Sequence, residues 1–87
     1  MPIVFIPPQL RQLTGGATQV QLTAKNIREV IAGLEDRFPG IKPRLCEGEE
    51  LSGRLQVSID GSLTSRGMLT KVSPTSEVHF LPAIGGG

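Results

Sequence analysis

The chain has 87 residues, of which 38% are hydrophobic and 20% are charged. A chain of this length forms one domain and buries roughly 60% of the surface that its unfolded form exposes. Nine Lys and Arg residues against eight Asp and Glu residues give a formal net charge of +1. Because the basic residues are interleaved with acidic ones, as in Arg28-Glu29, they do not form the clustered cationic surface that binds phosphates. Nucleic acid is therefore not expected as a partner.

Hydropathy and cysteine content indicate the cellular compartment in which the protein is expected. No apolar run approaches the ~20 residues that a membrane-spanning helix needs, so we expect no membrane partner. Residues 1–6 are apolar but lack the basic lead and the cleavage site of a signal peptide. The single cysteine, Cys46, cannot form an internal disulfide. These features predict a cytoplasmic location.

The first expected element is a strand at residues 3–6, which two prolines end because proline cannot donate to a sheet ladder. Gly15 and Gly16 predict a turn, because glycine adopts a positive φ without steric strain. Residues 18–23 alternate polar and apolar side chains with the period of a half-buried strand. We expect these two strands to pair antiparallel across a loop.

Residues 26–38 are the clearest helix. The apolar side chains that recur at helical spacing, and so form one stripe, are Ile27, Val30, Ile31, Leu34 and Phe38. Asn26 with Glu29 three residues later matches a capping box, with Asn in place of the usual Ser or Thr. Pro39-Gly40 ends the helix. Gly33 lowers helix propensity, and a close backbone approach to the sheet would explain it.

The second half of the chain has weaker signals. Residues 41–51 are expected to form a helical turn and then an exposed loop. Polar and apolar side chains alternate cleanly over residues 54–60 and predict a strand. The dipeptide Asp60-Gly61 predicts a turn after it, which leads to a shorter strand near residues 62–64. The last strand is expected at residues 77–81. Its alternation directs His79 and Leu81 away from Val78 and Phe80.

This order of elements predicts a two-layer α+β architecture of the β-grasp type. A mixed sheet of four or five strands packs on one main helix, which can cover only one of its faces. The other face stays open to solvent or to a partner. We expect residues 1–82 to form the domain and residues 83–87 to form a flexible C-terminal tail.

Three consecutive glycines, at 85–87, end the given sequence. Glycines have no side chain to pack, and they increase the conformational entropy of the chain. One interpretation is a frayed tail without a role, which is common at termini. The other is that the terminal carboxylate sits on an unbranched arm that can pass through a narrow channel into another protein's active site. A β-carbon would obstruct such a passage, and we favour this second interpretation.

The ending EVHFLPAIGGG, residues 77–87, resembles that of the small sulfur carrier proteins of the ThiS/MoaD type, which share the β-grasp fold with ubiquitin. The shared features are the final strand, its proline, an apolar residue and the Gly-Gly end. Within this family the chain is most similar to the cysteine-synthesis carriers called CysO. That similarity rests on Leu10-Arg11 before Thr14-Gly15-Gly16, and on Leu34-Glu35 before Pro39-Gly40-Ile41.

The chain departs from the family's pattern in two places. The family often has an Asp-Gly-Asp turn before the last strand, where this chain has SPTS at residues 73–76. Proline can preset that turn, so the fold is not threatened. Gly85 stands where relatives often carry alanine, which loosens the arm slightly without blocking its chemistry.

The resemblance implies a role for the terminal carboxylate. In this family an ATP-dependent adenylyltransferase of the ubiquitin-activating type, similar to ThiF or MoeB, adenylates the last glycine, here Gly87. A sulfur donor then displaces AMP and leaves a thiocarboxylate, while Gly85 and Gly86 provide reach. The carrier is then a cosubstrate and not an enzyme, and it binds no cofactor. ATP is used by the partner, and the sulfur goes to a sulfur-accepting synthase that makes cysteine or another sulfur-containing metabolite or cofactor.

Partner enzymes are expected to contact the open sheet face and the base of the arm. The candidate interface residues are His79, Leu81, Pro82 and Ile84, since an exposed apolar patch marks an interaction site. For Leu81, packing at the edge of the core is an equal alternative.

Two other residues are candidates for chemistry. His79 is the only histidine, so metal ligation within one chain is not expected, and a solvent-facing strand residue is the simpler interpretation. Cys46 follows Arg44 closely and could be an activated nucleophile. A partly buried, small apolar residue is the favoured interpretation, because no histidine accompanies it in sequence.

Three other functions compete with a biosynthetic sulfur carrier. The same activated glycine would serve a ubiquitin-like covalent protein modifier, and a permanent small subunit of molybdopterin synthase would also carry it. A noncovalent β-grasp interaction module would leave the glycines idle. The terminal position of the glycines favours the carrier over the idle module, but the sequence separates the first three poorly.

Overall fold

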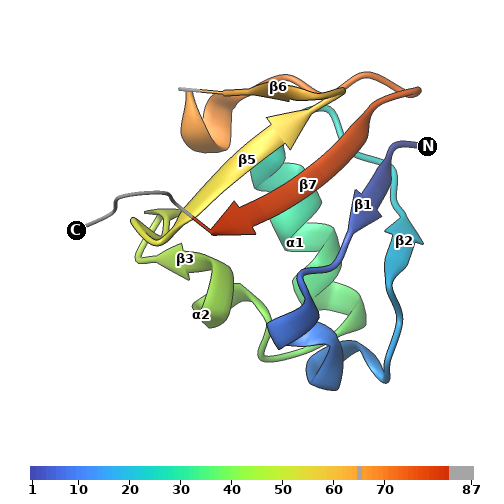
Figure 1. Ribbon diagram of the computed structural model, residues 1–87, viewed down its shortest axis with the longest axis vertical. Helices are drawn as coiled ribbons and strands as arrows, with labels where there is room; N and C mark the ends of the chain where they lie inside the picture. The colour runs from blue at the N-terminus through green and yellow to red at the C-terminus, as the bar shows by residue number, and fades with distance from the viewer. Residues whose placement is uncertain (65, 83–87) are drawn as a thin grey trace.

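The computed structural model describes residues 1–64 and 66–82 of the chain (Figure 1). The expected tail at residues 83–87 lies outside these residues. In chain order, the elements are β1 (Ile3–Phe5), the 3-10 helix η1 (Pro8–Thr14), β2 (Gln19–Gln21), α1 (Ile27–Arg37), α2 (Lys42–Leu45), β3 (Cys46–Glu47), β4 (Glu50–Leu51), β5 (Leu55–Ile59), β6 (Ser62–Leu63), the 3-10 helix η2 (Gly67–Leu69) and β7 (Glu77–Pro82).

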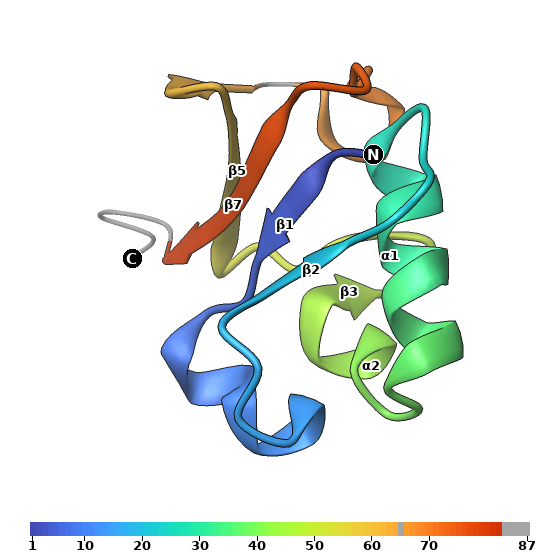
Figure 2. The same cartoon turned by 90° about the vertical axis from the view of Figure 1, so that its right-hand side faces the viewer.

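The described residues form one mixed sheet of five strands in the order β2-β1-β7-β5-β6. The first and the last strand run parallel at its centre, with Phe5 opposite His79. The other neighbouring strands are antiparallel. Helix α1 packs behind one face of this sheet and leaves the other face uncovered (Figure 2). The α+β prediction of a β-grasp fold with one main helix is confirmed.

The core lies between α1 and the covered face of the sheet. The predicted helix stripe is confirmed, because Ile27, Val30, Ile31 and Leu34 are fully buried. From the sheet, Val4 and Val78 meet this stripe with 0% of their surface exposed. Burial of such side chains supplies most of the stability of a small domain.

Local hydrogen bonds fix both ends of α1. At its start the Asn26 Oδ1 accepts a hydrogen bond from the Glu29 amide at 2.9 Å, as the capping pattern predicts. The Glu29 carboxylate in turn accepts a hydrogen bond from the amide of Lys25, one residue before the cap, at 2.8 Å. After the helix, the Glu35 carboxylate accepts from the amides of Gly40 and Lys42. These bonds lower the pKa of Glu35.

Gly33 is explained by a close approach. A β-carbon at this position would lie 3.3 Å from the Leu22 Cδ1, in the segment just after β2. The predicted contact with the sheet layer is therefore confirmed. It lets α1 lie close to the sheet where β2 ends.

The structure differs from the sequence prediction in two connections. The segment between β1 and β2 contains the 3-10 helix η1, which ends at Gly15 with a left-handed φ of +66°. The expected exposed loop after α2 instead forms a hairpin in which Cys46 stands opposite Leu51. Each of its strands has two residues, which is too short for an alternation pattern to show.

Candidate functional site

The central strand β7 leads directly to the C-terminal glycines. It is held on one side by β1 and on the other by β5, where Leu81 stands opposite Gln56 and Pro82 opposite Leu55. A strand paired on both sides is the most firmly held part of a sheet. Residues 77–79 are held in this way, and residues 80–82 continue past the end of β1, paired with β5 alone.

Alternation along β7 directs His79 and Leu81 away from Val78 and Phe80, as the sequence pattern predicts, whereas their role in an interface stays a prediction. Val78 and Phe80 are buried under α1, whereas His79 is half-buried and Leu81 is 38% exposed. Leu81 thus lies on the uncovered face, which decides against packing at the edge of the core. Pro82 is exposed at the end of the strand. Ile84, Gly85, Gly86 and Gly87 lie outside the described residues.

Phe5 and Leu63, which are not among the predicted interface residues, also lie on this face. The Phe5 and His79 rings stack with centroids 4.2 Å apart and planes 5° from parallel. Leu63 stands opposite Ser58 and is 60% exposed, so it extends the same face toward β6. The alternation of β1, with Val4 buried, could have placed Phe5 outward. Its partner could not be inferred, because the parallel pairing joins residues more than 70 positions apart.

We call Phe5, Leu63, His79 and Leu81 the open-face patch. The patch carries little charge: the side chains beside it include Gln56 and Ser58. On β7 itself, the Glu77 Oε1 lies 3.8 Å from the His79 Nε2. A partly apolar surface of this kind is suited to contact with another protein.

Cys46 is not placed for catalysis. It is a buried residue of the small hairpin formed by β3 and β4, and desolvation raises the pKa of its thiol, partly offset by the charge of Lys42. A raised pKa keeps the thiol protonated and poorly nucleophilic. The interpretation of Cys46 as a buried apolar residue is therefore confirmed.

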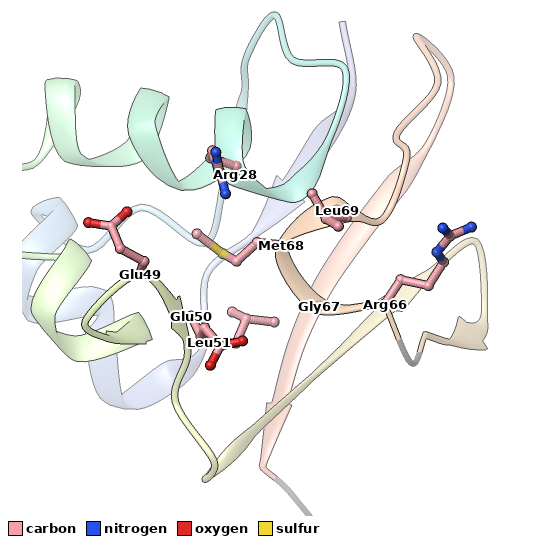
Figure 3. A pocket seen from close by; sticks show the side chains of 8 residues that line it. All are labelled: Arg28, Glu49, Glu50, Leu51, Arg66, Gly67, Met68 and Leu69. Atoms are coloured by element: carbon pink, nitrogen blue, oxygen red, sulfur yellow. The ribbon is translucent and has the colours of Figure 1, made fainter.

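A hollow beside helix α1 does not involve the candidate interface. A hollow of about 490 Å³ lies between the start of α1, the small hairpin and η2 (Figure 3). Its floor includes Met68 and Leu51, and its rim carries Arg28 and Glu49. The described candidates His79, Leu81 and Pro82 do not line it.

Two further features concern the part of the chain that the structure describes. Residues 1–64 and 66–82 contain no group of three or more His, Cys, Asp and Glu side chains that could hold a metal ion. Within the same residues, no helix is long and apolar enough to cross a membrane.

Comparison with known proteins decides the family. The family model described as the ThiS family matches residues 4–87. The chain belongs to the ThiS family. A curated relative, the sulfur carrier protein CysO of Mycobacterium tuberculosis H37Rv, is 32% identical over 90 residues, which cover 97% of this chain and 96% of the relative. The sulfur carrier protein CysO of Mycobacterium bovis matches equally well.

Solved structures show the same fold in this family. A crystal structure of an Amycolatopsis orientalis BexX/CysO complex contains a chain that is 32% identical, with a TM-score of 0.90 and full coverage of both chains. The crystal structure of M. tuberculosis CysO is 28% identical, with a TM-score of 0.87 and coverage of 97% of this chain and all of that one. The β-grasp fold and the likeness to CysO carriers are thus confirmed.

Proposed function

We propose that this ThiS-family protein is a sulfur carrier that works through a thiocarboxylate on Gly87. The observation that carries the proposal is the family match, which extends through the terminal glycines to residue 87. Curated relatives over nearly the whole chain are sulfur carrier proteins. The structure supports it by holding β7, which leads to those glycines, at the centre of the sheet.

The proposed chemistry occurs in two steps. In the first, a carboxylate oxygen of Gly87 attacks the α-phosphate of ATP, and pyrophosphate leaves. In the second, sulfide attacks the acyl carbon of the adenylate, the bond to the phosphate oxygen breaks, and AMP and a proton leave. Activation is needed because a carboxylate is a poor electrophile. The resulting thiocarboxylate is a soft anion and a good nucleophile at neutral pH, by the same reasoning as for thiolates.

The groups that do this chemistry belong to a partner. The described residues hold no activated nucleophile, and Cys46 is buried with a raised thiol pKa. We therefore assign adenylation to an adenylyltransferase of the ubiquitin-activating type and sulfur acceptance to a separate synthase, with cysteine as the favoured product. A protein partner is supported by the A. orientalis CysO chain, which occurs in a BexX/CysO complex.

The open-face patch and Pro82 are proposed to contact these partners, with Ile84 between them and the glycines. His79 and Leu81 lie on one face of the strand that ends at Pro82. A partner that grips this face therefore receives the glycine arm from a fixed direction. Gly85 and Gly86 have no β-carbon to obstruct a narrow channel.

Intact mass spectrometry tests the proposal. The protein is incubated with ATP, sulfide and the adenylyltransferase from the same organism. We expect a mass increase that corresponds to replacement of one oxygen atom by sulfur at Gly87. No change with an enzyme that is active on another carrier would overturn the proposal. Adducts on lysines of other proteins would favour a modifier, and tight co-purification with a larger subunit would favour a synthase subunit.

Deletion of Gly86 and Gly87 provides the matched control. We expect this variant to show no mass increase, because the reacting carboxylate is lost from its position at the end of the arm. Its melting temperature should equal that of the full chain, since terminal glycines have no side chain to bury. A large drop in melting temperature would show that the glycines are structural.

A further inference from the structure

A small hollow of about 240 Å³ lies beside the end of β7. Leu55, which lines it, stands opposite Pro82 in the sheet. Pro7, which also lines it, comes just after β1. Since β1 and β7 run parallel, both strands end at this same edge of the sheet. The hollow therefore adjoins the point where the chain continues beyond residue 82.

Two arginines from different segments line this hollow. Arg44 comes from α2 and Arg54 from the residue before β5, and both are exposed. Within residues 1–64 and 66–82, neither guanidinium lies within 4.0 Å of a carboxylate oxygen. A third cation, Arg11, donates from its Nε to the Ile6 carbonyl oxygen at 3.3 Å, on the same edge.

Three exposed acids, Glu47, Glu49 and Glu50, lie in the hairpin between the two arginines. Glu49 and Glu50 line the other hollow, beside Arg28, and Glu47 is hydrogen-bonded within its own segment. The Glu47 Oε1 accepts a hydrogen bond from the Ser52 hydroxyl at 3.1 Å and from the Gly53 amide at 3.2 Å. Those bonds hold the small hairpin to the residues that follow it. The two guanidiniums are thus the charged side chains that line this hollow, and no carboxylate of the described residues lines it.

The place of this arginine-lined surface, beside the end of β7, indicates which anion it meets. Five residues, 83–87, follow Pro82, and five extended residues span at most about 18 Å. When a partner draws the arm out to reach its ATP, the base of the arm stays outside, far from the reacting phosphate. The arginines then face the rim of the partner's channel. Carboxylates on that rim fit them, because guanidinium groups bind carboxylates bidentately.

We propose that Arg44 and Arg54 form a docking site for an acidic surface on the enzyme that activates the C-terminus. This inference rests on the proposed function and adds a partner chemistry to it. The open-face patch supplies apolar contact, and the arginine pair supplies steering and orientation. Charged rim contacts of this type act on association and are weakened by salt.

The test compares two charge reversals in the adenylation assay. The double variant Arg44→Glu/Arg54→Glu is expected to raise KM for the carrier about tenfold with kcat unchanged, because docking is weakened and the chemistry at Gly87 is not. The wild-type KM should rise steeply with salt, and the variant's KM should not. Arg44→Gln/Arg54→Gln should give a smaller change. The matched control, Arg66→Glu, reverses an exposed arginine beside η2 and should leave KM as in the wild type.

Equal KM values for the double variant and Arg66→Glu would overturn the docking site while leaving the proposed function intact. A fall in kcat with unchanged KM, together with AMP-induced shifts of the arginine Nε–H signals in NMR spectra, would also overturn it by assigning the pair to the nucleotide. Absence of any mass increase in the wild type is a different result, which overturns the proposed function itself. Thermal melts of every variant confirm that each remains folded.

Discussion

The two faces of the sheet differ in composition although the same strands build both. On β7, Val78 is 0% exposed beneath α1, whereas the next residue, His79, stacks on Phe5 on the uncovered side. On β1, Val4 is buried and its neighbour Phe5 is half-buried. The covered face is an apolar core, and the open face mixes aromatic, leucine and amide side chains. One face therefore holds the fold together, and the other is available for recognition.

The largest expected effect comes from the covered face. Leu34→Ala removes a side chain with 0% exposure from the helix stripe and should lower the free energy of unfolding by about 2–5 kcal/mol. That is a large share of the ~5–15 kcal/mol that stabilises a typical domain. Denaturant titration followed by circular dichroism measures it. A loss below about 1 kcal/mol would show that the helix layer is not the main source of stability.

The next effect should appear in activity and not in stability. Leu81→Asp on the open face is expected to raise KM for activation about tenfold, or ~1.4 kcal/mol, by placing a charge in an apolar contact. Its free energy of unfolding should stay within about 0.5 kcal/mol of the wild type. Leu69→Asp is the control, because Leu69 is 65% exposed on η2, outside the open-face patch. If both variants bind equally well, the patch is not an interface.

A smaller loss of stability is expected at the start of the covering helix. Asn26→Ala removes the Oδ1 that accepts from the Glu29 amide and should cost about 1 kcal/mol. Asn26→Asp retains an acceptor at the same position and should restore most of this energy. Thermal and denaturant unfolding of the two variants measures the difference. Equal stability of Asn26→Ala and wild type would mean that water replaces the cap.

The smallest effect is a pH dependence at the other end of the helix. Hydrogen bonds from the Lys42 and Gly40 amides lower the pKa of Glu35 from its ordinary value of 4.5. Because the folded-state pKa is the lower one, this contribution is complete above pH 4.5 and is lost as the pH falls through the lowered value. In Glu35→Gln, the free energy of unfolding should therefore fall less steeply as the pH drops below 4.5. An unchanged slope in urea titrations below pH 5 would contradict the assignment.

Much of the architecture follows from local patterns. Residues 26–38 show both a 3.6-residue apolar stripe and cap residues, so α1 and its buried side could be predicted from nearby residues alone. The strand order could not, because the pairing of β1 with β7 joins the two ends of the domain. The hairpin at Cys46–Glu47 and Glu50–Leu51 was missed because two-residue strands rich in glutamate carry no alternation.

In the candidate site, too, local patterns predict some residues and not others. The outward direction of His79 and Leu81 follows from the alternation of β7, and the structure has both on the open face. The arginine pair could not be predicted, since Arg44 and Arg54 lie ten positions apart and meet only through the small hairpin between them. The role of the terminal glycines stays a prediction, tested by the mass measurements above.

The parallel pairing at the centre of the sheet has a consequence for biosynthesis of the protein. Residues 77–82 fill the gap between the first strand and β5, so the sheet cannot close while the ribosome still holds them. Because β1 and β7 are far apart in the sequence, their pairing is a non-local contact that forms late in folding. A chain broken off before residue 77 lacks its middle strand and is left open to proteolysis. Pairing of β1 with β5 through a shared neighbour therefore depends on the last segment of the chain that the structure describes.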